Sequence, residues 1–365
     1  MMTVTFAEKL ARLPEYTAGL PSADASEKYG VAEITKLASN ESPYPPHPAV
    51  AEAVAQAATE ANRYPDPNAK VLRRRLAEIH EVDPAQIAVS NGSCEILLAA
   101  AEALCEPGAE IVYAWPAFSM YPHLPALTGA REVRVPLIDG DVHDLDAMLA
   151  EITAATQLVI VCNPNNPTGT HLPAAQVGAF LEEVPRHAIV ILDEAYVDFQ
   201  TNDDPEASVD LRKSFPNLVL LRTFSKNFGL AGLRVGYSIG PTQFRQAVDA
   251  VRQPFSVNAL AQAAAIEALA HHDDLADRVA KTIVERVFVE EGVRDLGLHT
   301  PDSQANFSWI KLGEDRDELG IIDGLGERGV IVRGGTSLGG PGHIRVTYGH
   351  RAENERFLAA LAEVL

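Results

Sequence analysis

The stretch LVLLRTFSKNFGLAGLR (residues 218–234) decides how the fold of this chain is interpreted. It begins as an apolar strand, places Lys226 beside a serine, and runs through a glycine-containing turn to an arginine. Two upstream stretches also join an apolar strand to polar groups: IVILDEAY (189–196) ends in carboxylates, and LVIVCNPNNPTG (158–169) ends in an amide-rich turn. Open α/β sheets bind ligands at the carboxyl ends of their strands, so we expect an amine, an acid and an amide in one site.

The segments around this stretch alternate between helix-like and β-rich between about residues 50 and 250. This alternation is typical of an α/β fold with a parallel sheet covered by helices on both faces. The expected strands are 87–90, 110–114, 131–136, 158–162, 188–192, 218–222 and 233–239, and the first expected helices are 49–61, 71–80 and 94–104.

The pattern changes at Gln253-Pro254. Beyond it we expect helices at 259–270, 275–291 and 352–364 and strands at 307–312, 330–333 and 344–348, which together predict a second, smaller α/β domain. The first 35 residues contain Pro14 and Pro21 and little periodicity, which indicates an arm packed on that domain. The predicted division is therefore an arm (1–35), a large domain (36–253) and a small C-terminal domain (254–365).

The composition disfavours several function classes. With 30 basic and 50 acidic residues the formal net charge is -20, which is unfavourable for binding nucleic acid or an anionic membrane. The one basic run, Arg73-Arg74-Arg75, is expected to be a solvated or inter-subunit helix face. Three cysteines are too few for a disulfide framework or a zinc site, and we expect no metal. Without a signal pattern or a membrane-length apolar run, the chain is expected to be soluble and cytoplasmic.

The polar groups at the strand ends match what pyridoxal phosphate (PLP) needs from a protein, since the cofactor itself stabilises the carbanion. Lys226 is the candidate for the Schiff-base lysine, which also moves the substrate proton. Asp193 would keep the cofactor's ring nitrogen protonated, and as a buried carboxylate it should have a cationic partner. Tyr196 and Asn166 are candidates to donate to the ring's phenolate oxygen.

A second group of residues fits the cofactor's phosphate and ring face. Ser93 and Cys94 open a helix directly after a strand, so their backbone N–H groups can bind an anion. Ser225 supplies a hydroxyl and Arg234 a fixed cation. Phe118 is a candidate to stack on the ring, with an ordinary place in the core as the alternative.

Together these stretches resemble the fold-type I PLP enzymes and, within them, the histidinol-phosphate aminotransferase family. The resemblance covers essentially the whole chain, with matches at 37–44 (LASNESPY), 63–66 (RYPD), 163–169, 193–196, 223–234 and 344–349. It implies a mostly parallel seven-stranded sheet, PLP as cofactor and a homodimer in which Tyr64 reaches the neighbour's cofactor phosphate.

The resemblance also implies roles for individual residues. Lys226, Asp193 and Tyr196 would be catalytic, and the cofactor would be held by the residues already named, namely Ser93, Cys94, Phe118, Asn166, Ser225 and Arg234. The substrate would be bound by Arg345, Arg333, Tyr16 and Asn40. Two positions depart from the family pattern: Asn227 stands where a small apolar residue is usual, and Cys94 where an acidic residue is common.

Five interpretations are compatible with this pattern: four involve PLP, and the fifth is a plain α/β scaffold without cofactor. The leading one is a transaminase that exchanges an amino group between glutamate and imidazole-acetol phosphate, and the second is an aromatic amino-acid transaminase. A phosphoamino-acid decarboxylase has no positive support in the sequence. A PLP-binding sensor without turnover is usually fused to a DNA-binding segment, and the chain has no basic N-terminal module of that kind.

Overall fold

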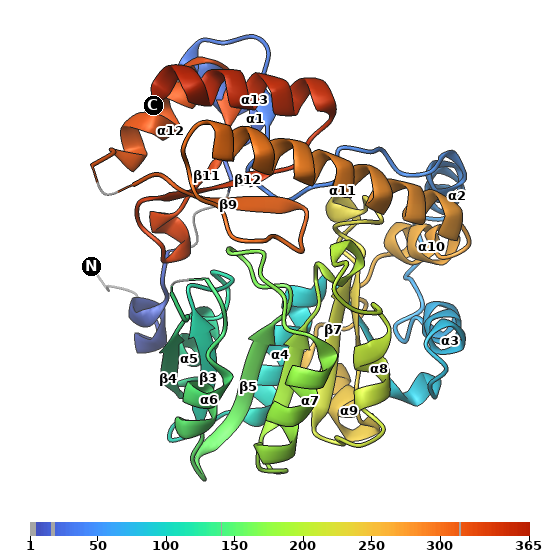
Figure 1. The fold of residues 1–365 in the computed structure, drawn as a ribbon. Helices are drawn as coiled ribbons and strands as arrows, with labels where there is room; N and C mark the ends of the chain where they lie inside the picture. Colours follow the sequence, from blue (N-terminus) through green and yellow to red (C-terminus); the bar gives the residue numbers. More distant parts are fainter. Residues whose placement is uncertain (1–4, 16–18, 140, 314) are drawn as a thin grey trace.

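The computed structural model describes residues 5–15, 19–139, 141–313 and 315–365. Its centre is a seven-stranded sheet in the order β2-β8-β7-β6-β5-β3-β4 (Figure 1). The strands are β2 (Ile87–Ser90), β3 (Glu110–Trp115), β4 (Arg131–Pro136), β5 (Thr156–Cys162), β6 (Ile189–Asp193), β7 (Leu218–Thr223) and β8 (Gly236–Ile239). Only β8 runs antiparallel to its neighbours, so the predicted α/β class with a mostly parallel sheet is confirmed.

The central strands are apolar throughout because both faces of the sheet are covered. In β5, Leu158 and Ile160 belong to one buried cluster, while Val159 and Val161 belong to the cluster on the opposite face. Helices α4, α5 and α9 contribute to the first cluster, and α2, α3, α6, α7, α8 and α10 to the second. This period-two alternation fixes the register, since a slip of one residue would exchange the two faces.

Of the helices around this sheet, α2, α3, α4 and α10 begin and end close to the predicted positions, whereas α5 to α9 were not predicted. The helices are α2 (Pro48–Ala58), α3 (Lys70–Ile79), α4 (Ser93–Leu104), α5 (His123–Thr128), α6 (Leu145–Ala150), α7 (Ala174–Glu183), α8 (Ala207–Leu211), α9 (Thr242–Val251) and α10 (Ala259–Ala268). Short 3-10 turns lie between them: η2 (Pro84–Gln86), η3 (Val197–Phe199) and η4 (Ala231–Leu233).

A three-stranded antiparallel sheet, in the order β11-β12-β9, lies above the carboxyl ends of the large sheet (Figure 1). It consists of β9 (Phe307–Lys311), β11 (Arg333–Gly334) and β12 (His343–Thr347), with the turn η5 (Thr336–Leu338) before β12. Its helices are α11 (His272–Asp295), α12 (Glu318–Glu327) and α13 (Arg351–Val364). The N-terminal segment forms η1 (Glu8–Arg12) and α1 (Ser22–Tyr29), and β1 (Thr35–Lys36) pairs in parallel with β10 (Val330–Ile331). No helix of the described residues is long and apolar enough to cross a membrane.

Three expectations for local structure were wrong in detail. The single strand expected at 330–333 is divided, because β10 pairs with β1 whereas β11 pairs with β12 in another sheet. The strand expected at 233–239 begins only at Gly236, since residues 231–233 form a 3-10 turn. Arg73 is not solvated: it is 7% exposed and forms an ion pair with Asp249 at 2.7 Å.

A buried ion pair joins the ends of β6 and β7. Arg222 Nε donates to a Glu194 carboxylate oxygen at 2.8 Å, and its Nη1 donates to Glu206 at 2.5 Å. Glu206 also contacts the His80 ring at 2.7 Å. Hydrogen bonds from His80 and the charge of Arg222 outweigh burial and lower the pKa of Glu206 to about 2, so that carboxylate stays ionised.

Arg222→Ala should destabilise the fold strongly, because it leaves two carboxylates without their cation. Losing one partner of a buried pair typically costs about 3–5 kcal/mol. Urea unfolding of the cofactor-free chain measures this loss. The control is Arg75→Ala, whose exposed pair with Glu78 should contribute no more than about 1 kcal/mol. Similar unfolding midpoints for the two variants would contradict this interpretation of the Arg222 network.

Candidate active site

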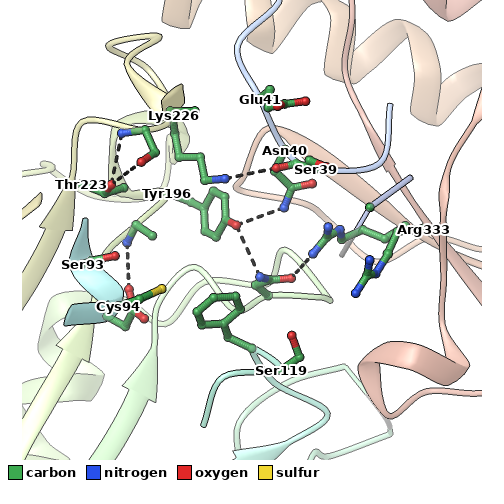
Figure 2. Close-up of a pocket in the computed structure, with 18 of the residues that line it drawn as sticks. Ser39, Asn40, Glu41, Ser93, Cys94, Ser119, Tyr196, Thr223, Lys226 and Arg333 are labelled. Carbon is green, nitrogen blue, oxygen red and sulfur yellow. Dashed lines mark hydrogen bonds between the residues drawn. The ribbon is translucent and has the colours of Figure 1, made fainter. Parts of the chain in front are cut away.

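A cavity of about 310 Å³ lies where the carboxyl ends of β5, β6 and β7 face the three-stranded sheet (Figure 2). Its walls include Lys226, Asp193 and Asn166, the amine, acid and amide that the sequence places after three separate strands. The parallel register explains their meeting, because Cys162 at the end of β5 is the Cα partner of Asp193 at the end of β6. The predicted meeting of these groups is therefore present in the structure.

Lys226 is half-buried, and its amine points across the cavity toward the segment at Ser39 and Asn40 (Figure 2). Its Nζ donates a hydrogen bond to the Ser39 carbonyl oxygen at 3.3 Å. Two effects lower the pKa of Lys226 to about 8. Burial disfavours the charged form of the amine, and the nearby Arg345 guanidinium repels that positive charge. A usable fraction of this amine is consequently neutral and nucleophilic near neutral pH.

Asp193 is a buried carboxylate, but its protein partner differs from the expected one. No cation of the described residues forms an ion pair with it; instead the Tyr121 hydroxyl donates to its Oδ2 at 2.8 Å. The Ala195 backbone N–H donates to Oδ1 at 3.3 Å. Burial raises the pKa of Asp193 to about 6. Tyr121 was missed because nothing in its spacing along the chain shows that it faces β6.

A chain of hydrogen bonds crosses the cavity wall beside Lys226 (Figure 2). The Tyr196 hydroxyl accepts from Asn40 Nδ2 at 3.0 Å and from Asn166 Nδ2 at 3.4 Å. Asn166 Oδ1 in turn accepts from Arg345 at 2.5 Å, and Arg345 also donates to the Ala38 carbonyl oxygen at 2.9 Å. The chain joins groups from both sheets, so it fixes the orientation of the amide and the phenol across the site.

At the opposite end of the cavity lies a pocket that suits a phosphate. Helix α4 begins at Ser93, so its first backbone N–H groups face the site. Arg234 Nη1 donates to the Ser225 hydroxyl at 3.3 Å. A Cβ on Gly92, which has φ +76°, would overlap the Arg234 guanidinium, and a Cβ on Gly236 would lie 2.5 Å from the Ser93 nitrogen. Only glycines allow the cation and the helix start to approach this closely.

Most of the remaining predicted residues also line the cavity. They are Cys94, Phe118, Arg333 and Asn40. Burial, followed by the charge of Asp193, raises the pKa of the Cys94 thiol, so it is not a ready nucleophile. Tyr64 is 82% exposed and does not line its own chain's cavity, and Tyr16 lies outside the described residues. Sequence reasoning did not identify Gly19, Ser119 and Leu338, which line the cavity as well.

The chemistry of these residues fits PLP. The buried Asp193 carboxylate suits a protonated ring nitrogen, and the Lys226 amine, whose pKa is lowered, suits an aldehyde. The start of α4 together with Arg234 suits a phosphate. Phe118 offers an aromatic face on the same cavity. The donor set therefore matches each polar part of the cofactor.

Comparison with known proteins also indicates a PLP-dependent enzyme. The model of the family "Aminotransferase class I and II" matches residues 32–361. An aromatic amino acid aminotransferase of Thermobifida fusca is 44% identical over 88% of each chain. A histidinol-phosphate aminotransferase of Geobacillus thermodenitrificans is 42% identical over 98% of this chain and 97% of its own.

A solved structure agrees closely with the fold. The histidinol-phosphate aminotransferase of Sinorhizobium meliloti, in complex with pyridoxal-5'-phosphate, superposes with a TM-score of 0.90 and 30% identity, over 100% of this chain and 98% of that one. The family match spans most of the chain and the relatives cover nearly all of it, so the chain belongs to the class I and II aminotransferases and is a PLP-dependent enzyme with the fold-type I architecture.

Proposed function

We propose that the chain transfers an amino group between histidinol phosphate and 2-oxoglutarate, giving imidazole-acetol phosphate and glutamate, in histidine biosynthesis. The observation that carries the proposal is the pair Arg333 and Arg345, which are Cα partners on adjacent antiparallel strands and are 8% and 6% exposed. Directly opposite residues share one face of a sheet, and both side chains line the cavity. Two buried guanidinium groups at one place favour a multiply charged group such as phosphate, which each can bind bidentately.

The reaction assigns a task to each polar group near Lys226. When bound, PLP supplies the electron sink for the bond that breaks at the substrate Cα. Lys226 would hold the cofactor, and its free amine would move the proton at the substrate Cα. Asp193 would hold a proton on the ring nitrogen, while Tyr196 and Asn166 would donate to the ring oxygen and fix the ring's orientation.

The phosphate end has a separate set of residues. The backbone N–H groups of Ser93 and Cys94, the Ser225 hydroxyl and the Arg234 guanidinium would bind the cofactor's phosphate. Phe118, which lines the same cavity, would stack on the ring. None of these groups needs to move a proton, so they bind and orient only.

A second candidate is an aromatic amino-acid transaminase. Several relatives carry that name, including one of Streptomyces coelicolor that is 42% identical over 97% of this chain. Phe118 and Leu338 give the cavity an apolar surface that a phenyl ring would also fill. An aromatic acid needs only one carboxylate clamp, which Arg345 alone would supply, so the two candidates differ in what Arg333 does.

We infer that the active unit is a homodimer in which Tyr64 of one subunit contacts the cofactor phosphate of the other. Tyr64 is 82% exposed, and its ring stacks on Phe255 with centroids 4.6 Å apart. A large aromatic side chain held in a fixed, exposed position is typical of a contact with a partner. Phe255 itself is 39% exposed, so the stacked pair forms an apolar projection.

The first test of the proposed substrate is the half-reaction. The purified PLP form is mixed separately with histidinol phosphate and with phenylalanine, and the absorbance of the bound cofactor is followed. We expect a second-order rate at least about 10-fold higher with histidinol phosphate, since a buried charge-assisted contact is involved. Arg333→Gln should remove this advantage and leave the phenylalanine rate nearly unchanged. Fast reaction with phenylalanine and none with histidinol phosphate would establish the second candidate instead.

The lowered pKa of Lys226 gives a prediction for the cofactor-free chain. Only the neutral amine attacks an aldehyde, so covalent uptake of PLP should accelerate as pH rises from about 6 through the pKa of about 8, and then level off. Borohydride reduction followed by mass spectrometry measures the attached cofactor. Lys226→Ala should show no attachment at any pH while its melting temperature is preserved. A rise centred near the ordinary lysine value would show that burial does not lower this pKa.

Subunit complementation tests the dimer. Lys226→Ala and Tyr64→Ala chains are unfolded together, refolded and compared with each variant alone. If Tyr64 acts in the partner's site, each mixed dimer contains one intact site, so random pairing should give about a quarter of wild-type activity. Activity no greater than the average of the two separate variants would mean that Tyr64 acts within its own chain or not at all.

A further inference from the structure

One wall of the cavity comes from a glycine-rich loop, residues 335–342, that joins β11 to β12. Leu338 lies at the end of η5 in this loop, is 2% exposed, and lines the cavity together with Phe118 and Arg333. Figure 2 shows Arg333 and Ser119 at the end of the pocket remote from Ser93 and Cys94. The loop therefore borders the substrate end of the cavity, away from the proposed phosphate pocket.

The loop is held in place by a single buried carboxylate. Glu318, on α12, accepts hydrogen bonds from the Thr336 backbone N–H and hydroxyl, both at 2.9 Å, and from the Gly342 N–H at 2.8 Å. Glu318 is 9% exposed, so these bonds are largely shielded from water. A charged acceptor with three donors makes stronger bonds than neutral pairs, and it fixes both ends of the loop.

Two aromatic rings pack closely against the loop backbone. A Cβ on Gly339 would overlap the Trp115 ring at the end of β3, and a Cβ on Gly340 would lie 2.5 Å from the Trp309 ring. The loop backbone thus lies flush against both indoles. Trp309 is itself fixed by stacking on His343, with centroids 4.7 Å apart. Leu338 is therefore a pre-formed part of the cavity wall rather than a mobile side chain.

We propose that Leu338 is a specificity-determining residue: it forms the apolar wall of the subsite that receives the side chain of the amino donor, and that subsite selects a flat ring. This inference rests on the proposed function and applies to both of its candidate substrates, since an imidazole and a phenyl group are each flat. Leu338 supplies apolar surface, while the cationic Arg333 would bind an anionic group of the substrate in the same region. Glutamate, the other amino donor, has no ring and gains little from this wall.

Substitution at Leu338 and half-reaction rates with three donors test the proposal. The donors are histidinol phosphate, phenylalanine and glutamate, each mixed with the PLP form. Leu338→Asn keeps a similar branched shape, although it is smaller, and makes the wall polar, so we expect the rate with the preferred ring donor to fall at least about 10-fold and the glutamate rate to change less than about 3-fold. Leu338→Met should keep ring-donor rates within about 3-fold, because its side chain is apolar and similar in volume.

The matched control is Leu319→Ala on α12, a leucine that is 69% exposed and should leave all three rates unchanged. The absorbance of bound cofactor and the melting temperature show whether each variant is folded and loaded. Equal losses with glutamate and the ring donor in Leu338→Asn would overturn the proposal and make Leu338 a support of the loop. Unchanged ring-donor rates would overturn it as well. A wild type that reacts with glutamate but with neither ring donor would instead refute the proposed function, and the ring subsite with it.

Discussion

The parallel register of β5, β6 and β7 is the constraint on which the rest of the site depends. Because Cys162 and Asp193 are Cα partners, and Asp193 in turn pairs with Leu221, three strands end at nearly the same level. The chain after each end then contributes one polar group to a buried place: Asn166, Asp193 and Lys226. Burial raises the pKa of the acid to about 6 and lowers that of the amine to about 8, so both pKa values lie near neutral pH. The two perturbed pKa values are thus a direct consequence of the sheet's architecture.

Much of this arrangement could be predicted from the sequence because short stretches specify it. An apolar run that ends in IVILD or LVLLRT is typical of a buried parallel strand, and the polar residue after such a strand lies at its carboxyl end. The same reasoning located Ser93, since a helix that starts directly after a strand presents its N–H groups at that edge. In each case the strand and the functional group are neighbours along the chain, so no knowledge of tertiary packing is needed.

What the sequence did not reveal depends on contacts between distant segments. Tyr121 follows the turn after β3, and its bond to Asp193 exists only because the two strands lie in one sheet with β5 between them. Leu338 lines the cavity only because Gly339 lies flush against Trp115, more than two hundred residues earlier in the chain. The break between β10 and β11 was missed for the same reason, since each half pairs with a different sheet. Periodicity describes the segment itself and carries no information about its partner.

The two sheets contribute different kinds of residue to the site. Lys226, Asp193 and the phosphate pocket come from the large sheet, whereas Arg333, Arg345 and Leu338 come from the three-stranded sheet and its loop. The first set faces the cofactor in our proposal and the second faces the substrate, with the bond between Arg345 and Asn166 joining them. Substitutions at Arg333 and Leu338 should therefore affect the substrate side while the groups that face the cofactor stay in place, whereas Arg345 is bonded to Asn166 and affects both. Relatives with 42% and 44% identity to the chain carry the names of two different aminotransferases.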